Sequence, residues 1–208
     1  MLFRSPVFVQ QAEQRIYNSV QFPSLRKNMT GVTQASNKYL SAPDDFLAVY
    51  SLAVITDVTG GDLNTGTYEY LLNKDVNFIR QAYPTPDDTG VPRYYALFGP
   101  TVASGVITNE LSFIMGPTPD AIYDVELHYY YYPESIVTAN TSWLGDNFDT
   151  VLLYGSLVEA YTYMKGEQDM MALYNQKYME ALTLAKRLGD GMERQDAYRS
   201  GQFRQAVT

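Results

Sequence analysis

Hydrophobic and polar positions alternate with a period of two between Ala121 and Tyr132. This pattern predicts a β-strand with one buried face, because successive side chains of a strand point to opposite sides of the sheet. Tyr130 and Tyr132 fall on the outer face and are candidates for contact with a partner, since tyrosine combines an apolar ring with a polar hydroxyl. The buried face is expected to carry Ala121, Tyr123, Val125, Leu127, Tyr129 and Tyr131, and the outer face begins with Asp124, Glu126 and His128.

The amino-terminal segment shows a helical pattern. Ser5 and Pro6 form a favourable helix start, and Pro23 marks its end. Between them the apolar residues recur at near-helical spacing, which predicts a short amphipathic helix. These residues are Phe8, Val9, Ala12, Ile16 and Val20.

Residues 25–140 have short runs of valine, tyrosine, leucine and threonine, broken by glycine and proline, which predict a mostly β region. One helix interrupts it, with Asn73 as the expected N-cap, Val76, Ile79 and Tyr83 on one side, and Pro84 as its stop. Strands are expected near residues 25–33, 49–57, 66–72, 93–98, 101–107, 110–115 and 121–132.

The last third returns to a helical pattern. Asn147 is expected to cap a helix that ends at Gly166, and a second helix should run from about Glu167 to Gly189. Two helices joined so tightly should lie antiparallel. The sequence therefore predicts an α+β protein with four parts: an N-terminal helix (1–24), a β insertion (25–140), a helical hairpin (141–191) and an extended C-terminal arm (192–208).

The arm has no periodic apolar face and cannot stay folded alone. Terminal arms of this kind are commonly disordered, but arginine and aromatic side chains also dominate interface hot spots. Its candidate partner contacts are Arg194, Tyr198, Arg199, Phe203 and Arg204.

Composition and charge exclude several classes of function. The 208 residues contain no cysteine, which excludes disulfides and thiolate chemistry. The formal charge of −8 disfavours binding to a phosphate backbone. The amino terminus lacks the features of a signal peptide, and no stretch is long and apolar enough for a membrane span, so we expect a soluble protein.

Candidate chemistry is sparse. The single histidine, His128, is expected on a strand surface, and the acidic pairs Asp44–Asp45 and Asp87–Asp88 resemble turns. No nucleotide or zinc motif is present, so we expect no catalytic, cofactor or metal-binding residues and no enzyme activity. Two alternatives stay open: a hydrolase that uses Asp44, Asp45 or Glu126, and an oligomeric carbohydrate-binding module that stacks sugars on Tyr130, Tyr132 and Trp143.

Four stretches resemble the head-to-tail adaptor (connector) proteins of tailed bacteriophages, in particular the portal adaptors of podovirus-like phages. They are YLSAPDDFLAVYSL, FIMGPTPDAIYDVELHYYYYPE, WLGDNFDTVLLYGSLVEAYTYMK and YNQKYMEALTLAKRLGDG, and together they cover most of residues 37–191. Order and spacing carry the resemblance, since none of the motifs is chemically unique.

The resemblance implies an α-helical bundle with a barrel- or sandwich-like, mostly antiparallel β insertion. It also implies a structural virion protein without catalytic residues, which assembles in the host cytoplasm into a ring, typically of twelve copies, at the neck. Its expected partners are itself, the portal protein, and tail or nozzle proteins, while genome DNA only passes through the channel. Twelve copies at −8 each would total −96, and acidity along a channel would repel DNA rather than hold it.

Overall fold

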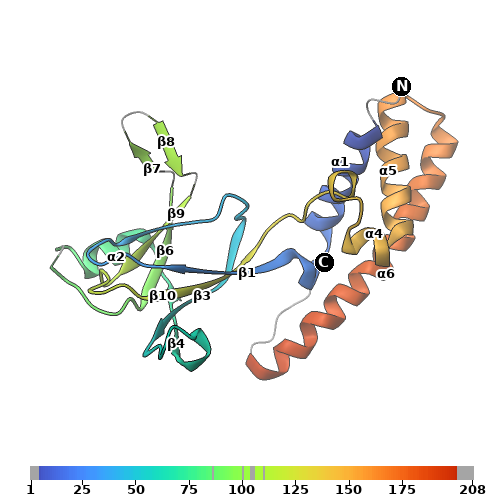
Figure 1. The fold of residues 1–208 in the computed structure, drawn as a ribbon. Helices are drawn as coiled ribbons and strands as arrows, with labels where there is room; N and C mark the ends of the chain where they lie inside the picture. The colour runs from blue at the N-terminus through green and yellow to red at the C-terminus, as the bar shows by residue number, and fades with distance from the viewer. Residues whose placement is uncertain (1–4, 86, 100, 104–105, 110, 201–208) are drawn as a thin grey trace. The chain divides into compact units, whose positions relative to one another are not determined.

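The computed structural model describes residues 5–85, 87–99, 101–103, 106–109 and 111–200. The chain divides into two compact units: a helical unit formed by the residues up to Leu25 and those from Tyr132 onward, and a β unit formed by Arg26–Tyr131. The expected α+β class is confirmed, with a β unit inserted between helical segments (Figure 1). Each unit has buried hydrophobic residues of its own.

The β unit contains two four-stranded sheets and a small hairpin (Figure 1). The first sheet is antiparallel, in the order β1-β10-β3-β4, and the second is mixed, in the order β2-β9-β6-β5, with β5 parallel to β6. The hairpin pairs β7 with β8. The strands are β1 (Arg26–Val32), β2 (Tyr39–Ser41), β3 (Ala48–Thr56), β4 (Thr67–Tyr70), β5 (Leu72–Asn73), β6 (Tyr94–Phe98), β7 (Thr101–Ala103), β8 (Val106–Asn109), β9 (Ser112–Gly116) and β10 (Asp124–Tyr130).

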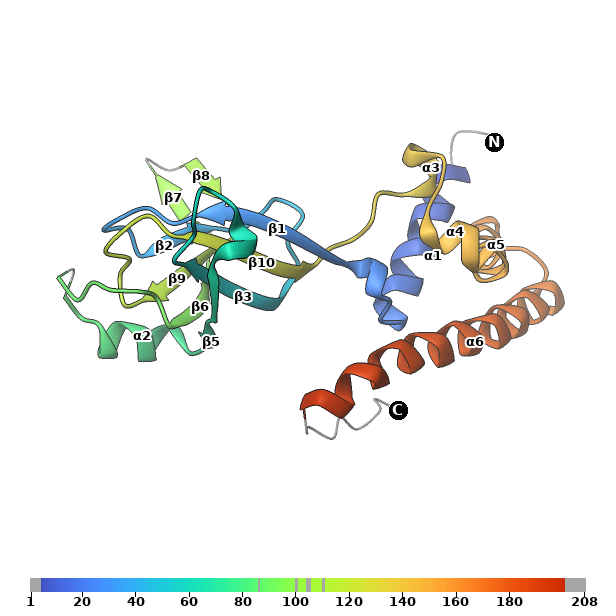
Figure 2. The same cartoon turned by 60° about the horizontal axis from the view of Figure 1, so that its bottom comes forward.

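The core of the β unit combines side chains from both sheets. Leu127 and Tyr129 of β10 and Phe113 of β9 belong to one buried cluster. The helix α2 (Val76–Ala82) covers the other side of β6 and β9 (Figure 2), where Ile79 packs with Ile114. All five residues of β9 are therefore buried, and its sequence shows no alternation because both of its faces are covered.

Several sequence-based boundaries in the β unit are wrong. The expected strands at 101–107 and 110–115 resolve into the hairpin β7–β8 and the strand β9, and the three-residue strand β2 was not expected. The cap of α2 is Asp75, whose carboxylate accepts a hydrogen bond from the Asn77 N–H at 2.7 Å. Asn73 cannot cap this helix because it lies in β5, paired with Tyr95.

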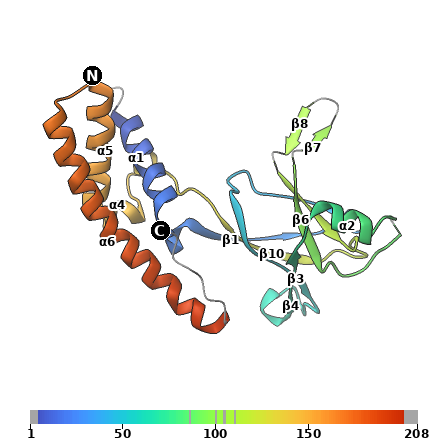
Figure 3. The same ribbon diagram turned by 180° about the vertical axis from the view of Figure 1, so that it is seen from behind.

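The helical unit contains α1 (Ser5–Ser19), α3 (Ile136–Ala139), α4 (Trp143–Asn147), α5 (Asp149–Met164) and α6 (Gln168–Ser200). Helix α5 contacts both α1 and α6, and the three helices lie side by side (Figure 3). The approach is close because α5 carries a glycine at the contact: a Cβ built on Gly155 would lie 3.2 Å from the Tyr178 ring and 3.3 Å from Ala12 Cβ. Single-turn 3₁₀ helices lie at Pro23–Leu25 and Leu63–Thr65. Within the described ranges, no helix has the length and apolar character that a bilayer span requires.

The ends of α5 and α6 differ from the expected ones. Asn147 belongs to α4, where its side chain donates to the Trp143 carbonyl, and the N-cap position of α5 is taken by Phe148. The left-handed residue that ends α5 is Lys165, with φ 55°, rather than Gly166.

Helix α6 does not end at Gly189 but continues to Ser200, so residues 192–200 are helical rather than extended. A Cβ built on Gly189 would lie 2.8 Å from the Gln21 carbonyl oxygen. The glycine thus lets α6 pass close to the segment after α1, and it does not act as a terminator.

The boundary between the units lies between Tyr131 and Tyr132 instead of at residue 140. The Tyr132 hydroxyl donates a hydrogen bond to the Asn18 side chain on α1. Four residues later the Ile136 N–H donates to Glu13 Oε1 at 3.0 Å, and Glu13 is a buried carboxylate on α1. These two bonds attach residues 132–136 to the helical unit.

Candidate functional site

The tyrosine strand β10 has the alternation that its sequence predicts. Val125, Leu127 and Tyr129 are buried, while Glu126, His128 and Tyr130 are half-buried on the other face. The regular strand begins only at Asp124 and ends at Tyr130, so Ala121 lies before it and is exposed. The aromatic run therefore forms a structural strand whose inner face is buried. The residues on its outer face are partly accessible to a partner.

A polar network ties the buried face of β10 to the Asp44–Asp45 turn. The Tyr129 hydroxyl donates to Asp45 Oδ1 at 2.7 Å, and Lys27 Nζ donates to Asp45 Oδ2 at 2.8 Å. Phe46 follows directly and packs edge-on against Phe113 in the core. The turn is thus anchored by both a carboxylate and a ring.

The hydrogen bonds of this network stabilise the ionised form of the Asp45 carboxylate. Partial burial pushes the pKa of Asp45 up, but the hydrogen bonds from Lys27 and Tyr129 outweigh it, and the net pKa is lowered. The hydrogen bond to Asp45 raises the pKa of Lys27. Burial, followed by the bond to Asp45, raises the pKa of Tyr129. With both oxygens engaged, Asp45 serves the structure, and the geometry gives no support to the hydrolase alternative.

The outer face of the β1–β10–β3 region carries a cationic and aromatic cluster, here called the β-face cluster and defined as Arg26, Tyr50, His128 and Tyr130. The Arg26 guanidinium carbon lies 4.7 Å from the centre of the Tyr50 ring. The Tyr50 ring lies 5.1 Å from the ring of His128 and 6.0 Å from that of Tyr130, both edge-on. Burial and the nearby Arg26 lower the pKa of His128, so the cluster carries its charge on the arginine.

Tyr50 and Arg26 were not singled out from the sequence. Their strands, β3 and β1, flank β10, and the register pairs Arg26 with Tyr130 and Ser51 with His128. The alternation on each strand can indicate which residues point outward. Only the register between the strands shows which of these outward residues are neighbours.

Tyr132 is not part of this cluster. It belongs to the helical unit, where its ring packs 6.5 Å from that of Tyr17 and its hydroxyl bonds to Asn18. Trp143, the third ring of the sugar-platform alternative, packs against Phe22 at 4.9 Å and Phe148 at 5.7 Å. Trp143 therefore serves the packing of the helical unit.

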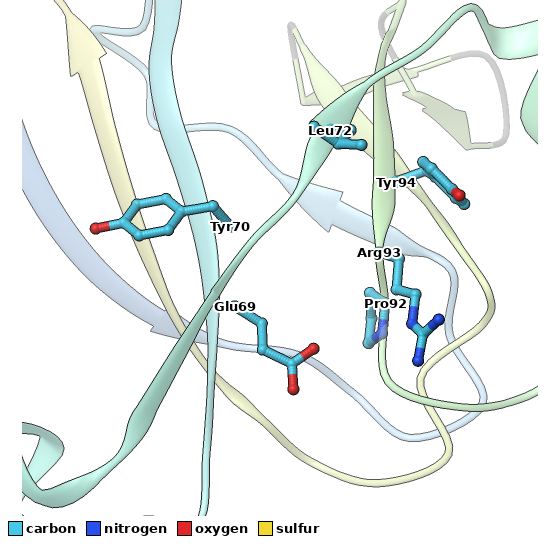
Figure 4. A pocket seen from close by; sticks show the side chains of 6 residues that line it. All are labelled: Glu69, Tyr70, Leu72, Pro92, Arg93 and Tyr94. Carbon is cyan, nitrogen blue, oxygen red and sulfur yellow. The ribbon is translucent and has the colours of Figure 1, made fainter. Parts of the chain in front are cut away.

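A shallow hollow of about 300 Å³ lies where β4, β5 and β6 meet (Figure 4). Tyr70 and Tyr94 point to opposite sides in this view, while the Glu69 carboxylate and the Arg93 guanidinium lie below them. Tyr70 is 68% exposed and Leu72 is 60% exposed. Such open, mixed lining is more typical of a protein contact than of an enclosed small-molecule site. The remaining lining residue is Pro92.

The acidic pair Asp87–Asp88 forms a local turn, in which Asp88 accepts a hydrogen bond from the Thr85 hydroxyl at 2.9 Å. Among the described residues, no three histidine, aspartate or glutamate side chains lie close enough together to hold a metal ion.

The expected partner contacts of the C-terminal arm fall on two parts of the chain. Arg194, Tyr198 and Arg199 lie on the last turns of α6. Phe203 and Arg204 lie outside the described residues.

An inserted β unit and a helical unit with exposed apolar side chains are features of a protein that assembles with others. The sequence pattern of the family described as SU10 adaptor protein matches residues 4–205, nearly the whole chain. The chain belongs to this family of phage adaptors, so it is a structural bacteriophage protein of the virion. No curated protein matches it.

Proposed function

We propose that this chain forms a ring beneath the portal protein and joins the capsid vertex to the tail. The observation that carries the proposal is membership of the phage adaptor family over residues 4–205. The exposed apolar side chains of the helical unit support it, because a ring protomer needs two lateral surfaces to meet its neighbours. The protein acts by binding on both sides, without turnover of a substrate, and assembles at the neck in the host cytoplasm. A twelve-copy ring is the stoichiometry that the sequence resemblance implies.

The portal side is assigned to the carboxy-terminal residues. Arginine and aromatic residues supply most interface hot spots, and the last seventeen residues are rich in both. Helix α6 continues to Ser200 and so includes Arg194, Tyr198 and Arg199. The contacts are assigned to Arg194, Tyr198, Arg199, Phe203 and Arg204.

The β-face cluster is assigned to lateral or tail contacts. Tyr130 is its candidate from the sequence, and the structure adds Tyr50 and Arg26 around it. Tyrosine and arginine are enriched where protein surfaces meet. Tyr132 keeps the same assignment on the helical unit, where 38% of it is exposed beside α1.

The channel role follows from charge. A chain with a formal charge of −8 does not attract a phosphate backbone, so a ring of such chains lets DNA pass without holding it. Genome DNA is then a passenger and not a ligand.

The test is a truncation after Gly191. A chain without residues 192–208 should keep its unfolding midpoint and lose only the helical circular dichroism signal of residues 192–200, yet should fail to bind the portal protein in a pull-down. A matched control replaces Arg80, exposed on the β unit, with alanine and should bind normally. Full binding by the truncated chain would remove these residues from the mechanism. Native mass measurement with and without the portal protein tests the ring itself, and a monomer under both conditions would refute it.

A further inference from the structure

Helix α5 is apolar on nearly all sides although only one side of it is covered. Its only charged residues are Asp149 in the first turn and Glu159, and Glu159 is bound to Arg15 of α1 at 3.0 Å. The buried side faces α1 and α6. Helices that are apolar all round normally lie in the interior of a structure. The buried residues are Val151, Leu152, Gly155 and Val158.

The uncovered side carries a continuous stripe, here called the α5 stripe: Leu153, Leu157, Ala160 and Met164. The spacing of four, three and four positions places these residues on one helix face. Leu153 is 57% exposed and Met164 is 50% exposed, while Leu157 and Ala160 are half-buried. The stripe contains no charge, as is typical of the centre of a protein interface.

Helix α6 carries a second stripe with the same spacing, here called the α6 stripe: Leu173, Lys177, Glu180 and Leu184. The two leucines are 47% and 62% exposed. Between them Lys177 Nζ lies 3.0 Å from Glu180 Oε2, so the two charges in the middle neutralise each other. One chain thus presents two different helical ridges of matching length.

We propose that the α5 stripe of one copy packs antiparallel against the α6 stripe of the next copy. This inference rests on the proposed ring. We place the ring axis along α5 and α6, which run antiparallel within one chain (Figure 3), and rotation about such an axis keeps the direction of each helix. Helix α5 of one copy therefore meets α6 of its neighbour in antiparallel orientation, a heterologous contact of the kind that closes rings.

The sizes of the facing side chains agree with this orientation. Antiparallel alignment of the two stripes sets Leu153 opposite Leu184 and Met164 opposite Leu173. Ala160 then falls opposite Lys177, where its small side chain leaves room for the long lysine, and Leu157 falls opposite Glu180.

The ends of the two stripes are also complementary in charge. Asp149, at the start of α5, falls beside Arg187, near the end of the α6 stripe. Lys165, after α5, falls beside Asp169 at the beginning of α6. A parallel alignment would set Asp149 near Asp169 instead, and the like charges would repel.

The experiment uses disulfide cross-linking, which is clean because the chain has no cysteine. Full-length Leu153→Cys and Leu184→Cys proteins are purified separately, mixed in equal amounts with and without the portal protein, and oxidised. The matched control is Met179→Cys, at a residue that is 52% exposed on the same helix but about 140° around it from residue 184. The expected product joins positions 153 and 184, at about tenfold the yield of the 153–179 product, since only contacting residues share a high effective concentration.

The outcomes separate the interface from the ring. Dominant links between two copies of Leu153→Cys would show that α5 stripes meet each other, and would overturn the heterologous contact. Oligomers detected by mass measurement without the 153–184 product would overturn the interface and leave the ring standing. If a tail protein alone protects the thiol of the Leu153→Cys variant from alkylation, the stripe belongs to that partner and the contact between copies is overturned. A monomer under all conditions would refute the ring and this contact together.

Discussion

The hydroxyl of Tyr129, near the end of the tyrosine strand, donates a 2.7 Å hydrogen bond to Asp45, a residue 84 positions earlier in the chain. The ring of Tyr129 is fully buried, whereas the carboxylate it reaches also binds Lys27 near the surface. A hydrophobic strand and an acidic turn are thereby joined through one side chain. The same bond explains why a tyrosine rather than a phenylalanine occupies this buried position.

Replacing Tyr129 with phenylalanine should lower the free energy of unfolding by about 1 kcal/mol, the usual net value of one hydrogen bond. The ring would still fill its place in the core, so no cavity contributes. Urea unfolding measures the change. Tyr70→Phe, at a highly exposed tyrosine of the same unit, serves as the control and should leave stability within error. Equal effects of the two substitutions would show that the Asp45 bond contributes nothing.

The stability supplied by Asp45 should depend on pH. Its folded-state pKa is lowered, so the contribution is present above the ordinary pKa of 3.8 and is lost as the pH falls through the folded pKa. The difference in unfolding free energy between the wild type and Asp45→Asn should therefore shrink between about pH 5 and pH 2. Urea unfolding at several pH values measures this difference. A difference that stays constant over that range would contradict the assignment.

Glu13 should matter for attaching residues 132–136 to α1. Glu13→Ala leaves the Ile136 N–H without its acceptor and should cost about 1–3 kcal/mol in unfolding free energy. Glu13→Gln retains an acceptor oxygen and should cost less. The exposed neighbour Gln14→Ala is the control, and chemical unfolding followed by circular dichroism is the measurement. A loss as large for glutamine as for alanine would mean that the charge, and not the acceptor, is needed.

Gly155 should tolerate no larger residue. A valine there would push against Ala12 and Tyr178, and overpacking of this kind costs about 1–3 kcal/mol. Gly191→Ala, at a helical glycine with open space around its added Cβ, should be neutral or stabilise by up to about 1 kcal/mol. Thermal unfolding of both variants gives the comparison. A stable Gly155→Val protein would show that α1, α5 and α6 can move apart freely.

Much of the local structure could be predicted from the sequence. The alternation around Val125 and Leu127 predicted the buried face of β10, because a strand with one covered face leaves a period of two. The resemblance to phage adaptors likewise followed from ordered motifs, and the family match over residues 4–205 confirms it. The alternation and the motif order can both be read along the sequence, because neither depends on which residues are in contact.

Helix ends were harder to predict. Asn73 and Gly189 have the residue types expected of a cap and a terminator, yet one lies in a strand and the other in the interior of a helix. A cap depends on where the backbone turns, which distant partners decide. At Asn73 the deciding partner is Tyr95, and at Gly189 the missing Cβ lets the continuing helix pass close to the Gln21 carbonyl.

The sequence by itself determined the α+β class, the buried face of the tyrosine strand and the adaptor family, since periodicity, composition and motif order are properties of the linear chain. Only the tertiary structure decided that Asp45 is held by Tyr129 and Lys27, that Arg26 and Tyr50 join Tyr130 on one face, and that one side of α5 stays uncovered. The physical reason is that strand register and helix packing bring together residues that are far apart along the chain, and local side-chain preferences do not specify those pairings.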